Sequence, residues 1–437
     1  MADYANLTNL VEVLKNVYGD GLANQFNDEK ITYNLFPKSD RRPAGNGYIF
    51  GLRYARAQGT GARAESASLP PPLTGIKDQG KILPRYNYGS IRITGPAIET
   101  AKGNVAAFVD GLADEIDDIY QSIVVDLNRQ AHGNGFGAVG ILSAAATPNT
   151  GATWTATFDN DVGVRYLQEG MLIDFYDATG ATADATCCSV RIKSINPNTK
   201  VVTFEAAAGA YKTSHPNATI AAYTETTDAV PVGAIAVKSG SRLPTHATTD
   251  TPYEITGLEG IYDDGTTLAT FENITVSGND KWAANVLGNS SVNRELSIDL
   301  MLAAVDTARL RSGKQIDTIR MGLGQRRKYA NLLMPDVRFA PTVLRGGYEV
   351  LSFAAGDGSI EMIIDPVQKP NKIYFEPKGV IMKYELSPLG WGNLDGSQLH
   401  QRAGYDEWDA FLRIYTNLGC EQRNCLVVLK DLAEPAA

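Results

Sequence analysis

One stretch, from Asn104 to His132, sets the strongest constraint on how this 437-residue chain can fold. Its apolar residues recur at steps of three and four, which predicts a single apolar stripe along one face of a helix. Asn104 can cap the start of this helix, and the segment Gly133-Asn134-Gly135 would end it. At about 1.5 Å per residue the helix would be roughly 43 Å long, which is unusual in a globular domain.

The polar face of this predicted helix is acidic. It carries six carboxylates and one base, which are Asp110, Asp114, Glu115, Asp117, Asp118, Asp126 and Arg129. Two interpretations stay open from the helix alone. The face is either a solvated surface of a core helix, or the side of a rod that meets a basic partner.

Composition places the chain among folded proteins without a membrane segment. Its net charge is −9 and 43% of its residues are hydrophobic, which is ordinary for a soluble domain. The length suggests about three domain-sized units. No apolar run approaches the roughly 18 residues of a membrane span, and the N-terminus lacks the apolar core of a secretory signal. We therefore expect synthesis in the cytoplasm.

A basic stretch precedes the long helix. Its ten bases are Lys38, Arg41, Arg42, Arg53, Arg56, Arg63, Lys77, Lys81, Arg85 and Arg92, against the acids Asp40, Glu65 and Asp78, a local charge of +7. Predicted strands at 48–52 and 86–93 flank a middle segment with few large apolar residues. We predict a long two-stranded projection whose tip cannot be buried in its own domain. A disordered basic linker and an arm that touches nucleic acid are the alternatives.

After the long helix, the pattern changes to short strands. Between about Thr150 and Val232, strands are predicted at 153–159, 170–177, 188–195 and 200–207, separated by turn residues. A block of this size indicates a small barrel or sandwich, and we interpret it as an independent insertion.

The remaining chain mixes helices and strands. Helices are predicted at 293–310 and at 325–333, the second ended by Pro335, and strands at 317–321, 348–353, 360–364, 372–375 and 380–384. The end is predicted to be a long strand pair, 408–420 with 425–432, joined by a four-residue turn.

No pattern of catalytic or ligand-binding residues is found. The four histidines stand alone, and neither a phosphate-binding loop, a nucleophile elbow nor a calcium loop occurs. The glycines at 133–137 follow a helix instead of opening one, so they match a phosphate loop only superficially. We therefore predict no catalytic residue, no cofactor and no metal. Cys420 and Cys425 are either buried free thiols or, across a short turn, a disulfide or metal clip.

The order of these elements resembles the major capsid protein of tailed bacteriophages, which has the Hong Kong 97 type fold. The stretches that carry the resemblance are 93–137, 253–265, 290–333 and 410–432. The resemblance implies an α+β fold in six parts. They are an N-terminal arm (1–45), an extended loop hairpin (46–95), a peripheral domain with the long spine helix (96–149), a β-rich insertion domain (150–232), an axial domain with its connections (233–400) and a C-terminal peripheral-domain hairpin (401–437).

The resemblance also implies a function. The chain would be a structural protein without enzymatic activity that self-assembles through pentamers and hexamers into an icosahedral virion shell. Portal and scaffolding proteins and a decoration protein would be its partners. Double-stranded DNA would be enclosed without specific binding, and no membrane would be involved. An encapsulin-like nanocompartment shell is the alternative with the same fold, and a carbohydrate-binding or structural β module is the alternative from another class.

In the family, the extended loop lies over a neighbouring subunit. The charges of this chain suggest how such a contact would be made here, because a basic loop and an acidic helix are complementary. The predicted pairing joins the bases Arg53, Arg56, Arg63, Lys77 and Lys81 to the acids Asp114, Glu115, Asp117 and Asp118 of the neighbour.

Overall fold

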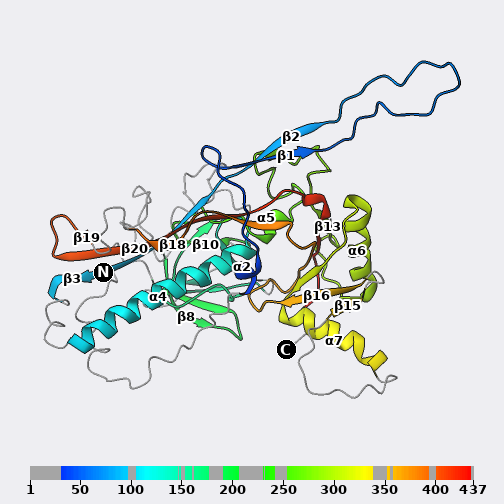
Figure 1. The fold of residues 1–437 in the computed structure, drawn as a ribbon. Helices are drawn as coiled ribbons and strands as arrows, with labels where there is room; N and C mark the ends of the chain where they lie inside the picture. Colours follow the sequence, from blue (N-terminus) through cyan, green and yellow to red (C-terminus); the bar gives the residue numbers. More distant parts are fainter. Residues whose placement is uncertain are drawn as a thin grey trace. The chain divides into compact units, whose positions relative to one another are not determined.

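The computed structural model describes residues 31–96, 105–145, 147–148, 153–159, 162–176, 190–205, 230, 232–241, 253–337, 352–354, 358–392 and 400–434. Residues 1–30 of the predicted N-terminal arm lie outside this description. The chain forms two compact units. Unit 1 comprises Met1–Leu35, Arg85–Ile255 and Ser387–Thr416, and unit 2 comprises Phe36–Pro84, Thr256–Leu386 and Asn417–Ala437. Figure 1 shows the elements of both units in sequence colours.

The long helix of unit 1 is confirmed. Helix α4, Val105–His132, has 28 residues and ends where the glycines begin (Figure 1). The partly buried Ile116 and Ile119 of α4 pack against Ile91 and Ile93 of strand β3 (Arg85–Thr94). A Cβ atom at Gly89 of β3 would lie only 2.6 Å from an Ile123 side-chain carbon, so a glycine at this position lets the strand approach the helix.

Strand β3 does not belong to the predicted projection, so the expected pairing of 48–52 with 86–93 is wrong. Instead β3 pairs antiparallel with β20 (Glu407–Cys420), and β18 (Ile381–Trp391) and β19 (His400–Gln401) complete this four-stranded sheet. The two arms of the projection are β1 (Tyr48–Arg53) and β2 (Lys77–Ile82). The physical reason is that one face of β3 is apolar and is buried by α4, which a solvent-exposed projection could not provide.

The predicted C-terminal hairpin at 401–437 is also wrong. Strand β20 pairs with β3 and β19, whereas β21 (Val427–Leu429) pairs with β13 and β17 in another sheet. Arg423 separates them. Its fully buried guanidinium lies 4.2 Å from the ring centre of Phe271, and it donates a 2.9 Å hydrogen bond to the carbonyl oxygen of Ile261. These contacts fix the connection in a 3-10 turn, Arg423–Cys425, instead of a hairpin turn.

Seven antiparallel strands of unit 1 form one sheet. Their order is β4 (Ala138–Ile141), β10 (Ile235–Lys238), β7 (Leu172–Tyr176), β8 (Val190–Asn196), β9 (Val201–Glu205), β6 (Thr153–Thr157) and β5 (Thr147–Pro148). A bridge between Leu142 and Phe158 joins the end of β4 to the end of β6, which closes the sheet on itself. We call it the closed sheet. Strands β6, β7, β8 and β9 match the predicted ones, but β4, β5 and β10 lie outside the predicted boundaries of 150 and 232.

The core of the closed sheet explains its closure. Phe158, Phe175 and Phe204 are almost fully buried, and the rings of Phe175 and Phe204 meet edge to face with their centres 5.8 Å apart. Alternate residues of β8 and β9 supply further buried side chains, which is the pattern of strands with one face turned to a core.

Unit 2 is built on a six-stranded sheet. Its order is β13 (Asn285–Leu287), β21, β17 (Ile373–Glu376), β14 (Thr318–Met321), β16 (Ser359–Ile364) and β15 (Ser352–Ala354). Helices α6 (Ile298–Ser312) and α7 (Leu323–Val337) confirm the predicted helical segments. However, α7 continues through Pro335, because a proline in the last turn removes only one backbone donor.

Short elements complete the described chain. They are α2 (Ile31–Leu35) in unit 1, and α5 (Leu258–Ile261), β11 (Thr270–Phe271) and β12 (Ile274–Thr275) in unit 2. A backbone hydrogen bond joins the projection to the rest of unit 2. The amide of Lys81 in β2 donates to the carbonyl oxygen of Glu272, between β11 and β12, at 2.9 Å.

Candidate assembly surfaces

The notable features of the described residues are exposed surfaces, and not clusters of reactive side chains. Among them, no group of three or more His, Cys, Asp or Glu side chains could hold a metal ion. No described helix combines the length and the apolar character that crossing a membrane requires. Cys420 and Cys425 are buried free thiols, so the disulfide alternative is not realised. Burial raises the pKa of the Cys425 thiol to about 12 and that of Cys420 well above its ordinary value.

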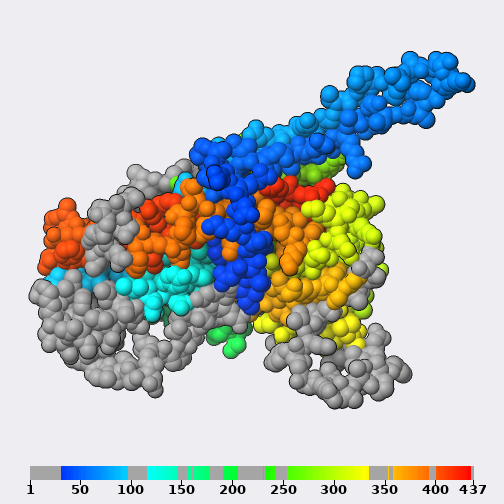
Figure 2. Space-filling model, in the orientation of Figure 1, coloured from blue at the N-terminus to red at the C-terminus, as the bar shows by residue number. Residues whose placement is uncertain are grey.

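The projection is a narrow ribbon that extends beyond β1 and β2. We call residues 54–76 the loop. Its base is closed by a 2.9 Å bond from the Tyr54 amide to the Ile76 carbonyl, and its end by a turn in which the Ala67 amide donates to Ala64. Gly75 permits the close approach of the two arms, because a Cβ there would lie 2.4 Å from a carbonyl oxygen. The loop reaches away from the rest of unit 2 (Figures 1 and 2).

The loop exposes apolar side chains along its returning arm. Leu69 is 86% exposed and Leu73 55%, and Ile76 at the base is 62% exposed. The segment Leu69–Leu73 also contains three consecutive prolines, and we call it the loop tip. Clusters of exposed apolar residues of this kind commonly mark protein contacts.

The basic stretch 38–92 carries less free positive charge than the sequence suggested. Lys38, Arg41 and Arg92 form ion pairs within the chain, Lys38 with Glu385 and Arg92 with Asp409, both at 2.6 Å. Arg85 is largely buried, and burial lowers its pKa. These bases therefore stabilise their own unit and do not contribute to a basic outer surface.

Five bases of β1, β2 and the loop remain available for an external contact. They are Arg53, Arg56, Arg63, Lys77 and Lys81, and none has an acidic partner among the described residues. Glu65 and Asp78 lie on the same hairpin, so the free charge is +3, from five bases and two acids. The sign of the predicted basic bias is retained, but its size is smaller than +7.

The acidic face of α4 is only partly exposed. Asp117 and Asp118 are exposed, whereas the side chains of Asp110, Asp114 and Glu115 lie outside the described residues. Asp126 was expected on the same solvent-facing side, but it is half-buried, so this expectation is wrong. The exposed acids of α4 among the described residues are therefore Asp117 and Asp118, in the middle of the helix.

Asp126 belongs to a buried ionic cluster at the end of α4. It binds Arg129 Nε at 2.9 Å and Lys238 Nζ at 3.0 Å, and Arg129 also binds Glu254. Burial alone would raise the pKa of Asp126, but Arg129 and Lys238 hold it well below its usual range. The pKa of Glu254 is raised, because burial outweighs the attraction of Arg129. The cluster joins α4 to β10 and to the segment that carries Glu254.

The outer face of the β3–β20 pair is aromatic. Tyr86 and Tyr88 are 53% and 58% exposed. The ring centre of Tyr415 lies 5.0 Å from that of Tyr86 and 5.9 Å from that of Tyr88, both edge to face. The Tyr88 and Tyr415 hydroxyls are 3.5 Å apart, and this contact raises the pKa of Tyr88 to about 12. The sequence analysis missed this surface, although the alternation in β3 carries its signal.

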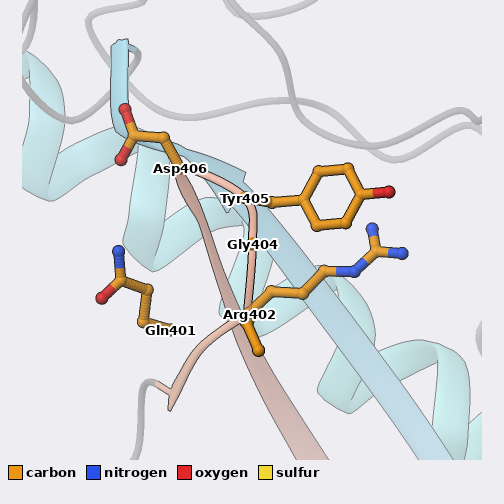
Figure 3. Close-up of a pocket in the computed structure, with 6 residues that line it drawn as sticks. Gln401, Arg402, Gly404, Tyr405 and Asp406 are labelled. Carbon is orange, nitrogen blue, oxygen red and sulfur yellow. The ribbon is translucent and has the colours of Figure 1, made fainter.

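The turn between β19 and β20 presents a second exposed aromatic group. The guanidinium of Arg402 lies 4.1 Å from the ring centre of Tyr405, and Figure 3 shows both side chains pointing to the same side of the turn. Arg402 also binds Glu407 at 3.0 Å. The hollow beside them is lined only by consecutive residues, 401–406, so it is an open surface feature and not a ligand pocket.

Comparisons with known proteins give a likeness of fold. No protein-family model matches this chain, and no curated protein sequence matches it. The solved structure named "Cyanophage A-1(L) capsid asymmetric unit" is similar, with a TM-score of 0.54, 14% identity, and coverage of 98% of this chain and 99% of that chain. "The capsid of Myoviridae Phage XM1" has a TM-score of 0.45 and 8% identity, covering 99% and 100%. On the first of these likenesses, this chain has the fold of a phage capsid protein.

Proposed function

We propose that this chain is the major capsid protein of a tailed bacteriophage, with the Hong Kong 97 type fold. It self-assembles into pentamers and hexamers and then into the icosahedral shell of the virion. The observation that carries the proposal is a loop with an exposed apolar tip on a chain whose capsid-like fold spans 98% of its length. In a monomer this tip is a liability, whereas in a shell it is a contact surface.

The parts of the fold take their roles from this proposal. The β1–β2 hairpin with its loop is the extended loop, and α4 with the β3–β20 sheet is the peripheral domain. The six-stranded sheet with α6 and α7 is the axial domain. The closed sheet, from β4 to β10, is the insertion domain, which makes it longer than the 150–232 block of the sequence analysis.

The charge distribution supports a contact between neighbouring copies. The unpaired bases of the loop and its strands lie on a chain that is −9 overall. They pair with the exposed acids Asp117 and Asp118 of a neighbour, together with Asp114 and Glu115. Exposed ion pairs contribute only about 0.2–1 kcal/mol each, so they select the partner and its register more than they hold the shell together.

The remaining partners follow from the same role. A net negative wall does not hold its own genome tightly, so the enclosed double-stranded DNA needs no specific site on this chain. Portal, scaffolding and decoration proteins are the further partners of such a shell. The chain itself is made in the bacterial cytoplasm and acts as a structural protein without enzymatic activity.

Electron microscopy of the full-length chain, expressed alone and with the neighbouring genes of its source, tests the proposal. We expect closed shells with pentamers and hexamers. A monodisperse monomer at high concentration under every salt and scaffold condition would contradict the proposal. Shells that enclose a protein cargo and no DNA would favour the nanocompartment alternative.

A further inference from the structure

An aromatic surface on unit 1 is left without cover in the described chain. We call it the tyrosine face. On the side of β3 and β20 that points away from α4, it consists of Tyr86, Tyr88, Phe411, Arg413 and Tyr415. Ser90 and the ion pair of Arg92 with Asp409 border it on the same side. Phe411 is 36% exposed, in addition to the two exposed tyrosines of β3. The opposite side of the same two strands is buried against α4, so the sheet has one satisfied and one unsatisfied apolar side.

The register of the two strands assembles this face from distant parts of the sequence. Tyr86 lies opposite Tyr415, and Tyr88 lies opposite Arg413. The edge-to-face contacts among the three tyrosines fix the rings as a stepped platform. Because rigid rings lose little conformational entropy on binding, such a platform is suited to hold a stiff apolar segment.

The loop tip has the complementary chemistry. Three consecutive prolines favour the polyproline II conformation, which is stiff before binding and carries no backbone donors to satisfy. Proline-rich segments of this kind bind on surfaces lined with aromatic side chains. The flanking Leu69 and Leu73 are exposed and need an apolar surface that the rest of the loop does not offer.

The charges beside the two surfaces also match. Arg413 lies on the tyrosine face with its guanidinium 5.6 Å from the Tyr415 ring centre, and it has no acidic partner among the described residues. Glu65, an exposed acid four residues before the tip, has no basic partner among them either. An acid on the tip side and a base on the face give the contact a preferred direction.

We propose that the loop tip of one copy binds the tyrosine face of a neighbouring copy, with Glu65 directed toward Arg413. This inference rests on the proposed function, because it names the surface on which the extended loop lies. It is separate from the charge pairing with α4, since the tyrosine face and α4 lie on opposite sides of β3. The tip therefore has a different footprint from the bases near the two strands, such as Arg53, Arg56 and Lys77, and each can be tested by itself.

Photo-crosslinking in assembled particles gives a direct test. Leu73 is replaced by p-benzoylphenylalanine in the full-length chain, and particles are assembled from equal amounts of isotope-labelled and unlabelled protein. After irradiation, we expect mixed-label cross-linked peptides that join position 73 to 85–94 or 407–416. Cross-links to α4, to unit 2 or to a different protein, or particles without any cross-link, would overturn the inference. A failure to form particles would instead count against the proposed function.

Paired substitutions give a second test with a matched control. Tyr86→Ser with Tyr88→Ser, and Leu69→Ser with Leu73→Ser, should each raise the protein concentration needed for assembly at least tenfold. Tyr253→Ser, which changes an exposed tyrosine outside α4, β3 and β20, should leave it within twofold. Circular dichroism checks that each variant is folded, as exposed positions should allow.

Combining the two pairs of substitutions separates a direct contact from two independent effects. If the tip binds the face, the combined variant should assemble about as well as whichever of the two double-substitution variants assembles less well. Effects that multiply in the combined variant would overturn the inference. A variant that assembles normally despite losing either surface would overturn it as well.

Discussion

Replacing Glu272 by Gln should remove a pH dependence from the stability of unit 2. One carboxyl oxygen of Glu272 is buried without a hydrogen-bond partner, and the other accepts a 2.9 Å bond from the Cys420 amide. Burial raises the pKa of Glu272 to about 8, and the bond from Cys420 and the attraction of Arg423 for the charged form only partly oppose this rise. The backbone carbonyl of Glu272 also accepts the hydrogen bond from the Lys81 amide. The carboxyl group that takes up the proton therefore lies at the base of the projection.

The sign follows from which state binds the proton more tightly. The folded protein holds the proton with a pKa near 8, and the unfolded chain with an ordinary value near 4.5. Protonation therefore stabilises the fold fully below the unfolded value, and this stabilisation is lost as the pH rises through about 8. Between pH 5 and pH 9 the loss is roughly 4 kcal/mol, at 1.36 kcal/mol per unit of pKa difference.

Urea unfolding of the unassembled protein at pH 5, 7 and 9 measures the effect. The wild type should lose several kcal/mol of unfolding free energy at this site between pH 5 and pH 9. Glu272→Gln should not show this loss, because the amide stays neutral at all three pH values. Glu65→Gln, a change at an exposed acid, is the control and should leave the wild-type profile unchanged. If Glu272→Gln shows the same pH profile as the wild type, the carboxyl is not protonated in the fold and the reasoning is wrong.

Three further outcomes are expected. Reversing Arg53, Arg56 and Lys77 to Glu should block assembly without changing the circular dichroism spectrum, and normal assembly at low salt would contradict the pairing with α4. Arg129→Met should lower the unfolding free energy by about 3–5 kcal/mol in urea titrations, because it leaves Glu254 buried and unpaired. Replacing the closed sheet by a short glycine linker should leave unit 2 protected in hydrogen exchange, and general loss of that protection would contradict its independence.

The elements of this fold were predictable wherever their signal is local. Helix α4 follows from a regular apolar stripe and a glycine stop, and the strands of the closed sheet follow from short alternating runs between turns. The strand partners were not predictable in the same way. Residues 86–93 alternate like the arm of a hairpin, but their apolar side needs α4, and this preference is visible only once the helix is in place.

The charge of the candidate surface was harder to predict than its location. Arg41 binds Glu421, which lies 380 residues away in the sequence. Asp126 has the spacing of a surface acid, yet it is half-buried and pairs with Arg129 and Lys238. A count of charges along the sequence includes such residues, so it overestimates the charge that a partner can meet. The five bases of β1, β2 and the loop that have no acidic partner among the described residues were all in the original set, which is why the sign of the prediction survives.

The tyrosine face and the loop tip show what a single chain leaves unsatisfied. The tip belongs to unit 2 and lacks a core of its own, while the face belongs to unit 1 and lacks a cover. Each surface would be a defect in a monomeric protein, where exposed apolar groups of this size favour aggregation. A contact between copies satisfies both at once, and it recurs at every subunit of a closed shell. Each contact can then stay weak enough for errors in assembly to be reversed, while the repeated contacts together hold the shell.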